Sequence, residues 1–118
     1  MAEFAIGVPI VLLILFAIMQ LGTVYHDWVA LTDASRAGAR VAAESRTDST
    51  RVQDVESAVV ASASSDLSTS KLVVDAPSTS WSPGSTVTEC AHYPYSISIL
   101  AIPVSSGNLD SCTTQLVQ

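Results

Sequence analysis

The stretch MAEFAIGVPIVLLILFAIMQLGTVYHDW, residues 1–28, decides the fold of this chain. It carries one carboxylate at Glu3 and no further charge until Asp27, so residues 4–25 form an uninterrupted uncharged run. A helix that crosses a membrane needs about 20 predominantly apolar residues, and this run is long enough. The sequence therefore predicts an apolar helix that a small domain cannot bury by itself.

The apolar start differs from a cleavable secretory signal, which has a basic beginning, a shorter apolar core and a small-residue cleavage site. A solitary membrane span fits less well, because Glu3 is costly near lipid and its nearest positive partner is the α-amine of Met1. Pro9 lacks an N–H and should kink or loosen the helix. Gly7 and Gly22 would let neighbouring backbones approach closely. These features favour a helix that packs against copies of itself.

The following stretch, HDWVALTDASRAGARVAAES at residues 26–45, contains no turn signal and continues the helical period. Leu31, Ala34 and Gly38 fall on one stripe of this stretch, opposite a more polar side. We therefore expect one helix over residues 3–46, about 65 Å long, with an apolar first half and an amphipathic second half.

The chain beyond this helix predicts a second, shorter helix at about 50–64. Thr50 and Gln53 have the spacing of a capping box, and apolar residues then recur at helical spacing. Pro83 and Gly84 mark a turn.

Strands are expected on both sides of that turn, at residues 71–75, 85–93 and 110–117. Residues 95–104 are apolar, but the prolines at 94 and 103 favour an edge strand or an irregular segment there over a central strand. Alternation within the middle strand places four residues on one face, namely Val87, Glu89, Ala91 and Tyr93.

Two cysteines, Cys90 and Cys112, are either buried thiols or a disulfide, and a disulfide would persist outside the cytoplasm. A bridge would join the 85–93 strand to the last strand and close a loop of roughly 20 residues, worth about 3 kcal/mol.

The predicted class is α+β, with a long N-terminal helix, a short second helix and a small antiparallel sheet on the distal half of the long helix. We divide the chain into an apolar filament-core or transmembrane helix at 1–26, an amphipathic continuation at 27–48 and an extracellular globular domain at 49–118.

Composition and motifs argue against several functions. The net charge is −6 with one lysine and four arginines, so no basic face for nucleic acid is visible. His26 and His92 are far apart, and Cys90 beside His92 lacks the repeated spacing of a zinc site. The sequence contains neither a nucleophile-elbow pattern nor a glycine-rich phosphate loop. We expect no enzyme activity, no catalytic residue, no metal and no cofactor.

Several motifs taken together resemble the TadE-like pilins, the minor pilins or pseudopilins of the tight-adherence (Flp, type IVc) pilus system. The matching residues are Glu3-Phe4-Ala5, Pro9, Gln20-Leu21-Gly22, and Ala30 to Ala43 with Arg36, Gly38 and Arg40.

The resemblance implies a prepilin peptidase that cuts a basic leader and leaves a free α-amine with an acid close behind it. It also implies a helix that waits in the cytoplasmic membrane until an ATPase-driven assembly machine extracts it. In related proteins the acid is usually the fifth residue after cleavage, whereas Glu3 is the third residue here. Either Met1 follows an unusual cleavage, or a short leader has been removed and the numbering begins inside the mature chain.

The sequence is therefore interpreted as a structural subunit that polymerises through its apolar helix into an extracellular filament of identical copies, used for adhesion or surface attachment. The expected assembly residues are Met1, through its terminal amine, together with Glu3, Gly7, Pro9 and Gly22. Glu3 would be neutralised by a terminal amine, its own or a neighbour's. Two alternatives stay open: a minor pilin that primes or caps a filament of another pilin, and a singly membrane-anchored surface-binding protein.

Overall fold

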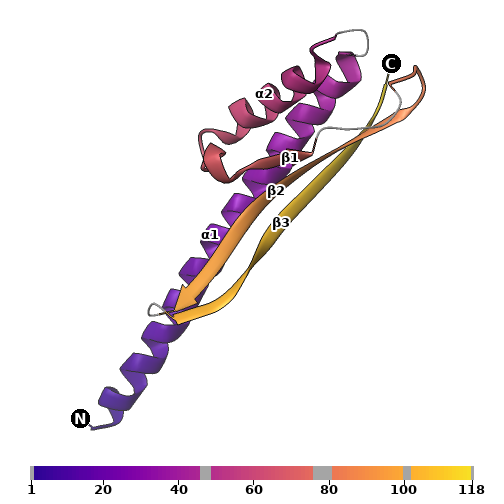
Figure 1. The fold of residues 1–118 in the computed structure, drawn as a ribbon. Coiled ribbons are helices and arrows are strands. Elements are labelled where there is room, and N and C mark those ends of the chain that lie inside the picture. The colour runs from indigo at the N-terminus through magenta and orange to yellow at the C-terminus, as the bar shows by residue number, and fades with distance from the viewer. Residues whose placement is uncertain (1, 46–48, 76–80, 100–101, 118) are drawn as a thin grey trace.

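The computed structural model describes residues 2–45, 49–75, 81–99 and 102–117, with side chains from Phe4 onward. The molecule is elongated, measuring 72 × 24 × 20 Å. A single long helix forms its axis, and a second helix and a three-stranded antiparallel sheet lie along the distal half of that helix (Figure 1). The α+β class predicted from the sequence is confirmed.

Helix α1 runs from Ala2 to Glu44 without interruption. Pro9 lies inside it and was expected to kink or loosen the rod, yet the α-helix continues through this position. The predicted end at residue 46 is close to the observed end, and residues 46–48 lie outside the described residues.

Helix α2 spans Arg51–Ala63, close to the predicted 50–64. The capping box predicted at its start is wrong, since Thr50 makes no side-chain bond to the backbone. The Thr50 hydroxyl instead donates to Asp54 Oδ2 at 2.9 Å, and the first turn is closed by Asp54 N donating to the Thr50 carbonyl at 3.0 Å. A short 3₁₀ helix, η1 (Thr69–Lys71), then leads into the sheet.

The sheet has the order β1-β2-β3, with β1 at Val73–Asp75, β2 at Thr86–Ile99 and β3 at Ile102–Leu116. The described residues of the range 95–104 are strand with an open edge, in line with the edge strand predicted there, but this range does not form one separate strand. Its first part continues β2, and its last part begins β3.

The prolines are accommodated because the long hairpin leaves backbone edges open. Within the described residues, β1 covers β2 only opposite residues 90–92. Pro94 therefore lies where β2 has β3 on one side and no described strand on the other. Pro103 lies in β3, which is itself an edge strand. A missing N–H is tolerated on an edge that pairs with no neighbour.

The hydrophobic core lies between α1, α2 and the inner face of β2 in two clusters. Leu31 and Ala34 of α1 meet Val59 of α2 and Tyr93 of β2 in the first cluster. The second cluster lies nearer the distal end and consists of Ala42, Val55, Val87 and Val117. Both clusters lie beyond the apolar first half of α1.

Candidate assembly surface

The first half of α1 is almost uncovered by the described part of its own chain. Its large apolar side chains are exposed all round the helix, from 43% at Leu13 to 80% at Phe4. Among the described residues, α1 is the one helix whose length and composition suffice to cross a membrane. Surface of this kind needs either lipid or another protein, because monomeric soluble proteins rarely expose apolar patches so large.

The glycines of α1 differ in what surrounds them. A Cβ added at Gly38 would clash with Val59 Cγ2 and lie 3.1 Å from Glu89 Cδ, so this glycine is required by packing inside the chain. A Cβ added at Gly7 or Gly22 would meet nothing within 4 Å. Nothing within the described part of the chain therefore requires a glycine at these two positions.

Shallow apolar hollows occur on the bare helix where small or ring-shaped residues interrupt the larger side chains. One is lined by Phe4, Gly7, Val8, Val11 and Leu12. Another lies beside Pro9 and is also lined by Leu12, Leu13 and Phe16. Hollows of this kind can receive side chains of a neighbouring helix.

Two of the predicted assembly residues cannot be placed in the same way. Met1 lies outside the described residues, and Glu3 is described only as a helical residue of α1, without its side chain. The pairing predicted between the Glu3 carboxylate and a terminal amine therefore stays a prediction.

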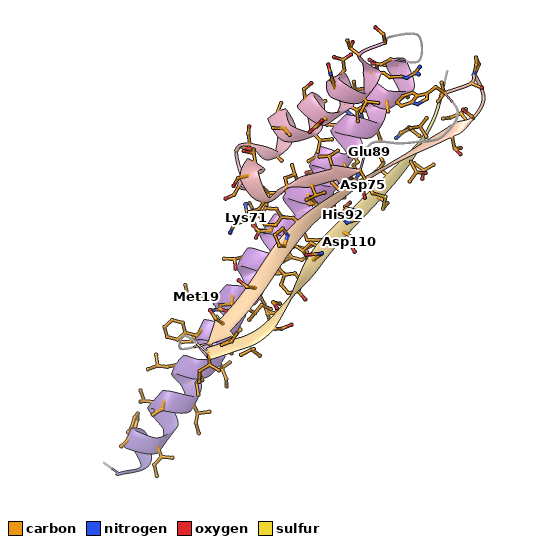
Figure 2. All side chains as sticks on the ribbon, viewed as in Figure 1. Met19, Lys71, Asp75, Glu89, His92 and Asp110 are labelled. Atoms are coloured by element: carbon orange, nitrogen blue, oxygen red, sulfur yellow. A yellow bond between two sulfur atoms is a disulfide. The ribbon has the colours of Figure 1, made fainter. Side chains whose placement is uncertain are left out.

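The lower end of the β2–β3 hairpin reaches down along α1 and is held there by Gln20. The amide nitrogen of Gln20 donates to the carbonyl of Ser98, and Ser98 N donates to Gln20 Oε1 at 3.0 Å. An open groove of about 420 Å³ beside this contact is lined by Phe16, Met19, Gln20, Thr23 and Ser96. In Figure 2, Met19 lies next to this end of the hairpin. No local sequence pattern indicates this contact, because its two partners are 78 residues apart.

A second polar contact joins α1 to the sheet nearer the core. The buried hydroxyl of Ser35 lies 2.8 Å from Thr113 Oγ1 and 3.2 Å from Ser111 Oγ on β3. It also donates to the carbonyl of Thr32. Together with Gln20, this contact fixes the hairpin along the helix at two levels.

Glu89 on β2 is fully buried beneath α1. The alternating pattern placed it on one face with Val87, Ala91 and Tyr93, and the structure shows that this is the buried face. Neither of its carboxylate oxygens has a hydrogen-bond partner among the described residues. Burial without compensation disfavours the charged form and raises the pKa of Glu89 to about 7. The carboxyl is therefore largely protonated in mildly acidic solution.

The outer face of the sheet carries a His–Asp cluster and the disulfide. His92 Nδ1 lies 2.6 Å from Asp110 Oδ1, and His92 Nε2 lies 3.2 Å from Asp75 Oδ2, which links all three strands (Figure 2). The bond to Asp110 is the main cause of a raised His92 pKa. Cys90 and Cys112, opposite each other in the β2–β3 register, are joined by a disulfide.

Both ring nitrogens of His92 are thus engaged by carboxylates. Within residues 2–45, 49–75, 81–99 and 102–117, no group of three His, Cys, Asp or Glu side chains has an arrangement that could hold a metal ion. His26, the other histidine, lies 3.6 Å from Asp66 in an exposed pair.

Comparison with known protein families gives a match that lies on α1. Residues 1–40 match the profile of a family described as TadE-like protein. No curated protein and no solved structure matches the chain. The matched residues contain the whole exposed apolar half of α1 and the first part of α1 that enters the core, including Leu31, Ala34 and Ala39. Residues 1–40 are therefore similar to TadE-like proteins, as the motifs predicted, which is consistent with a TadE-like protein of the Tad pilus system.

Proposed function

We propose that this chain is a structural subunit of a Tad-class, type IV-related pilus and that it polymerises through the first half of α1 into a filament of identical copies. The family match by itself suggests a Tad pilus-associated protein. The observation that carries the finer proposal is the bare apolar half of α1, which the described part of the chain leaves exposed. The proposed role is structural and does not involve catalysis.

The energetic basis of the proposal is burial of this surface among neighbouring helices. Fully burying one Leu, Ile, Val or Phe side chain contributes about 1.5–3 kcal/mol relative to water. Within a bilayer, lipid already solvates the helix, so extraction requires work from an assembly machine. Outside the membrane the alternative is water, and packing of α1 against copies of itself becomes favourable.

Gly7 and Gly22 support helix packing between copies. They have no packing partner in the described part of the chain, in contrast to Gly38, and small residues let neighbouring backbones approach. The hollow beside Gly7 would receive a side chain from an adjacent subunit. Before assembly, α1 would span the cytoplasmic membrane after cleavage of a leader by a prepilin peptidase.

The proposal is tested by shearing surface material from cells that carry the Tad assembly machinery and imaging it by cryo-electron microscopy. Filaments built from repeated copies of this chain are the expected result. Recovery only in the membrane fraction would support the surface-binding anchor instead. Filaments of another pilin, with this chain at one end, would support the minor pilin.

A matched pair of variants sharpens the test. Gly7→Leu fills the hollow but keeps the stretch apolar, so membrane insertion should persist while filament yield falls. Ile14→Leu, on the same bare surface but outside both hollows, should leave membrane insertion and filament yield unchanged. Equal filament yield from the two variants would contradict packing at Gly7.

A further inference from the structure

The lower end of the β2–β3 hairpin differs chemically from the rest of the sheet. We call the described residues 95–99 and 102–107 the hairpin end. Ile102 and Val104 are 67% and 61% exposed there. The sequence has no Asp, Glu, Lys, Arg or His between His92 and Asp110. The hairpin end is therefore an exposed, uncharged surface of isoleucine, valine and serine.

This surface lies beside the apolar half of α1. Ser98 is bound to Gln20, which belongs to the uncharged run of α1 that ends at Tyr25. Figure 1 shows the hairpin ending next to α1 part of the way down the helix, with the N-terminal part of α1 extending beyond it. The uncharged part of the helix and the uncharged part of the hairpin thus form one end of the molecule.

The depth of the Gln20–Ser98 contact in a bilayer follows from the position of Gln20 along α1. A hydrocarbon layer of about 30 Å takes about 20 helical residues, so a span that begins near Phe4 ends near Thr23. Gln20 precedes Thr23 by three residues and lies about 5 Å inside that boundary. Elements that lie in a membrane interface bury their apolar side by about 5–10 Å, and the hairpin end would reach this depth.

The hydrogen bonds of Ser98 suit such a place. Beyond the end of β1, no described strand pairs with that edge of β2, so its backbone groups depend on water or side chains. In lipid, an unsatisfied backbone group costs several kcal/mol. Gln20 satisfies both the N–H and the carbonyl of Ser98 on that side. Serine hydroxyls around it suit the headgroup region more than the centre of the bilayer.

We infer that the hairpin end is a second membrane-contacting element, which inserts into the outer interfacial layer of the bilayer beside α1 and sets the depth of the subunit before assembly. The partner is a lipid surface. This inference rests on the membrane-anchored stage of the proposed function and does not depend on the filament.

The experiment uses the full chain in phosphatidylcholine vesicles, with bromine placed on the acyl chains either close to the headgroups or near the chain ends. Trp28→Phe and Trp81→Phe remove the native fluorophores. Ile102→Trp then reports on the hairpin end. Its control, Leu116→Trp, lies at the other end of β3 and replaces a residue of similar exposure. Leu12→Trp reports on the middle of the apolar helix.

The expected result is loss of Ile102→Trp fluorescence with bromine near the headgroups, little loss with bromine at the chain ends, and protection from acrylamide in the water. Leu116→Trp should lose fluorescence to acrylamide alone. Leu12→Trp should be quenched most by bromine at the chain ends. Val104→Trp serves as a second reporter if Ile102→Trp does not fold by circular dichroism.

Acrylamide quenching of Ile102→Trp as strong as that of Leu116→Trp, with Leu12→Trp still quenched by lipid, would overturn the inference and leave the anchor intact. Protection of Ile102→Trp from both acrylamide and bromine would show that another copy covers the hairpin end, and would also overturn it. Failure of lipid to quench Leu12→Trp would remove the membrane-anchored stage itself.

Discussion

The carboxyl group of Glu89 lies against the backbone of Gly38, at the point where β2 crosses beneath α1. A Cβ at position 38 would approach Glu89 Oε2 to 3.1 Å and would clash with Val59 of α2. The absence of a side chain at Gly38 therefore allows α1, α2 and β2 to meet, and it leaves room for a carboxyl group with no hydrogen-bond partner among the described residues.

Gly38→Ala should destabilise the distal domain. Overpacking costs about 1–3 kcal/mol, and the better helix propensity of alanine returns up to about 1 kcal/mol, so a net loss of roughly 1–2 kcal/mol is expected. Gly22→Ala is the matched control, because its Cβ would meet nothing within 4 Å. Thermal unfolding of the full chain in detergent, followed by circular dichroism, measures the difference. Equal melting temperatures for Gly38→Ala and Gly22→Ala would show that the packing around Gly38 can accept a methyl group.

Glu89 makes stability depend on pH. Its folded pKa of about 7 lies above the ordinary value of 4.5, so the folded state binds more protons and stability falls as pH rises from about 4.5 to 7. The loss amounts to roughly 3 kcal/mol across that window. His92 adds to the same trend, because its raised pKa gives stability that is fully present below 6.5 and is lost as pH rises through its folded pKa.

Glu89→Gln isolates the carboxyl contribution. The variant and the wild type should have similar free energies of unfolding near pH 4.5, and the variant should be the more stable of the two above pH 7. The pH dependence of stability that is due to His92 should persist in the variant. Urea titrations of both proteins at a series of pH values give the free energies of unfolding. Suppose the free energies of unfolding of the two proteins depend on pH in the same way. The pKa of Glu89 would then not be raised in the folded state.

Gln20→Leu should release the lower end of the hairpin without unfolding the core. The variant keeps the apolar character of α1 but removes the acceptor of the Ser98 N–H, so hydrogen exchange at that amide should become faster. Gln53→Leu, on the exposed side of α2, is the control. Amides of Val87 and Ala91 should exchange as slowly as in the wild type. Unchanged exchange at Ser98 would show that Gln20 does not hold the hairpin.

Glu3→Gln should lower filament yield while leaving the amount of membrane-bound subunit unchanged. The expected reason is loss of the charge that pairs with a terminal amine and sets the position of each subunit relative to the next. Glu56→Gln, an exposed carboxylate of α2, is the matched control. Quantitative immunoblots of sheared and membrane fractions provide the measurement, and normal filament yield from Glu3→Gln would contradict the pairing.

Local sequence patterns predicted the elements that depend on near neighbours. Helical periodicity located α1 and α2 to within two residues at each end, and alternation put Glu89 on the same face as Val87. The capping box at Thr50 failed because Asp54, one turn later, offers its carboxylate to the same hydroxyl.

The long hairpin could not be predicted in the same way. A proline argues against a continuous strand only when the strand has hydrogen-bonded neighbours on both sides. Whether β2 has a second neighbour at Pro94 depends on the length of β1, which the residues around the prolines do not determine. The contacts of Gln20 and Ser35 with the hairpin join residues more than 75 positions apart, and no local pattern links them.

The unbroken course of α1 has a mechanical consequence. A force applied to the apolar end is transmitted to the globular end through one helix, which is continuous from Ala2 to Glu44. Between Gln20 and Ser35 the hairpin is hydrogen-bonded to the helix at both levels and resists bending of the helix there. Below Gln20 the rod is unsupported, and Pro9 removes one of its internal hydrogen bonds. Flexure of the subunit under load is therefore concentrated in the segment that lies deepest in a bilayer or in a bundle of copies.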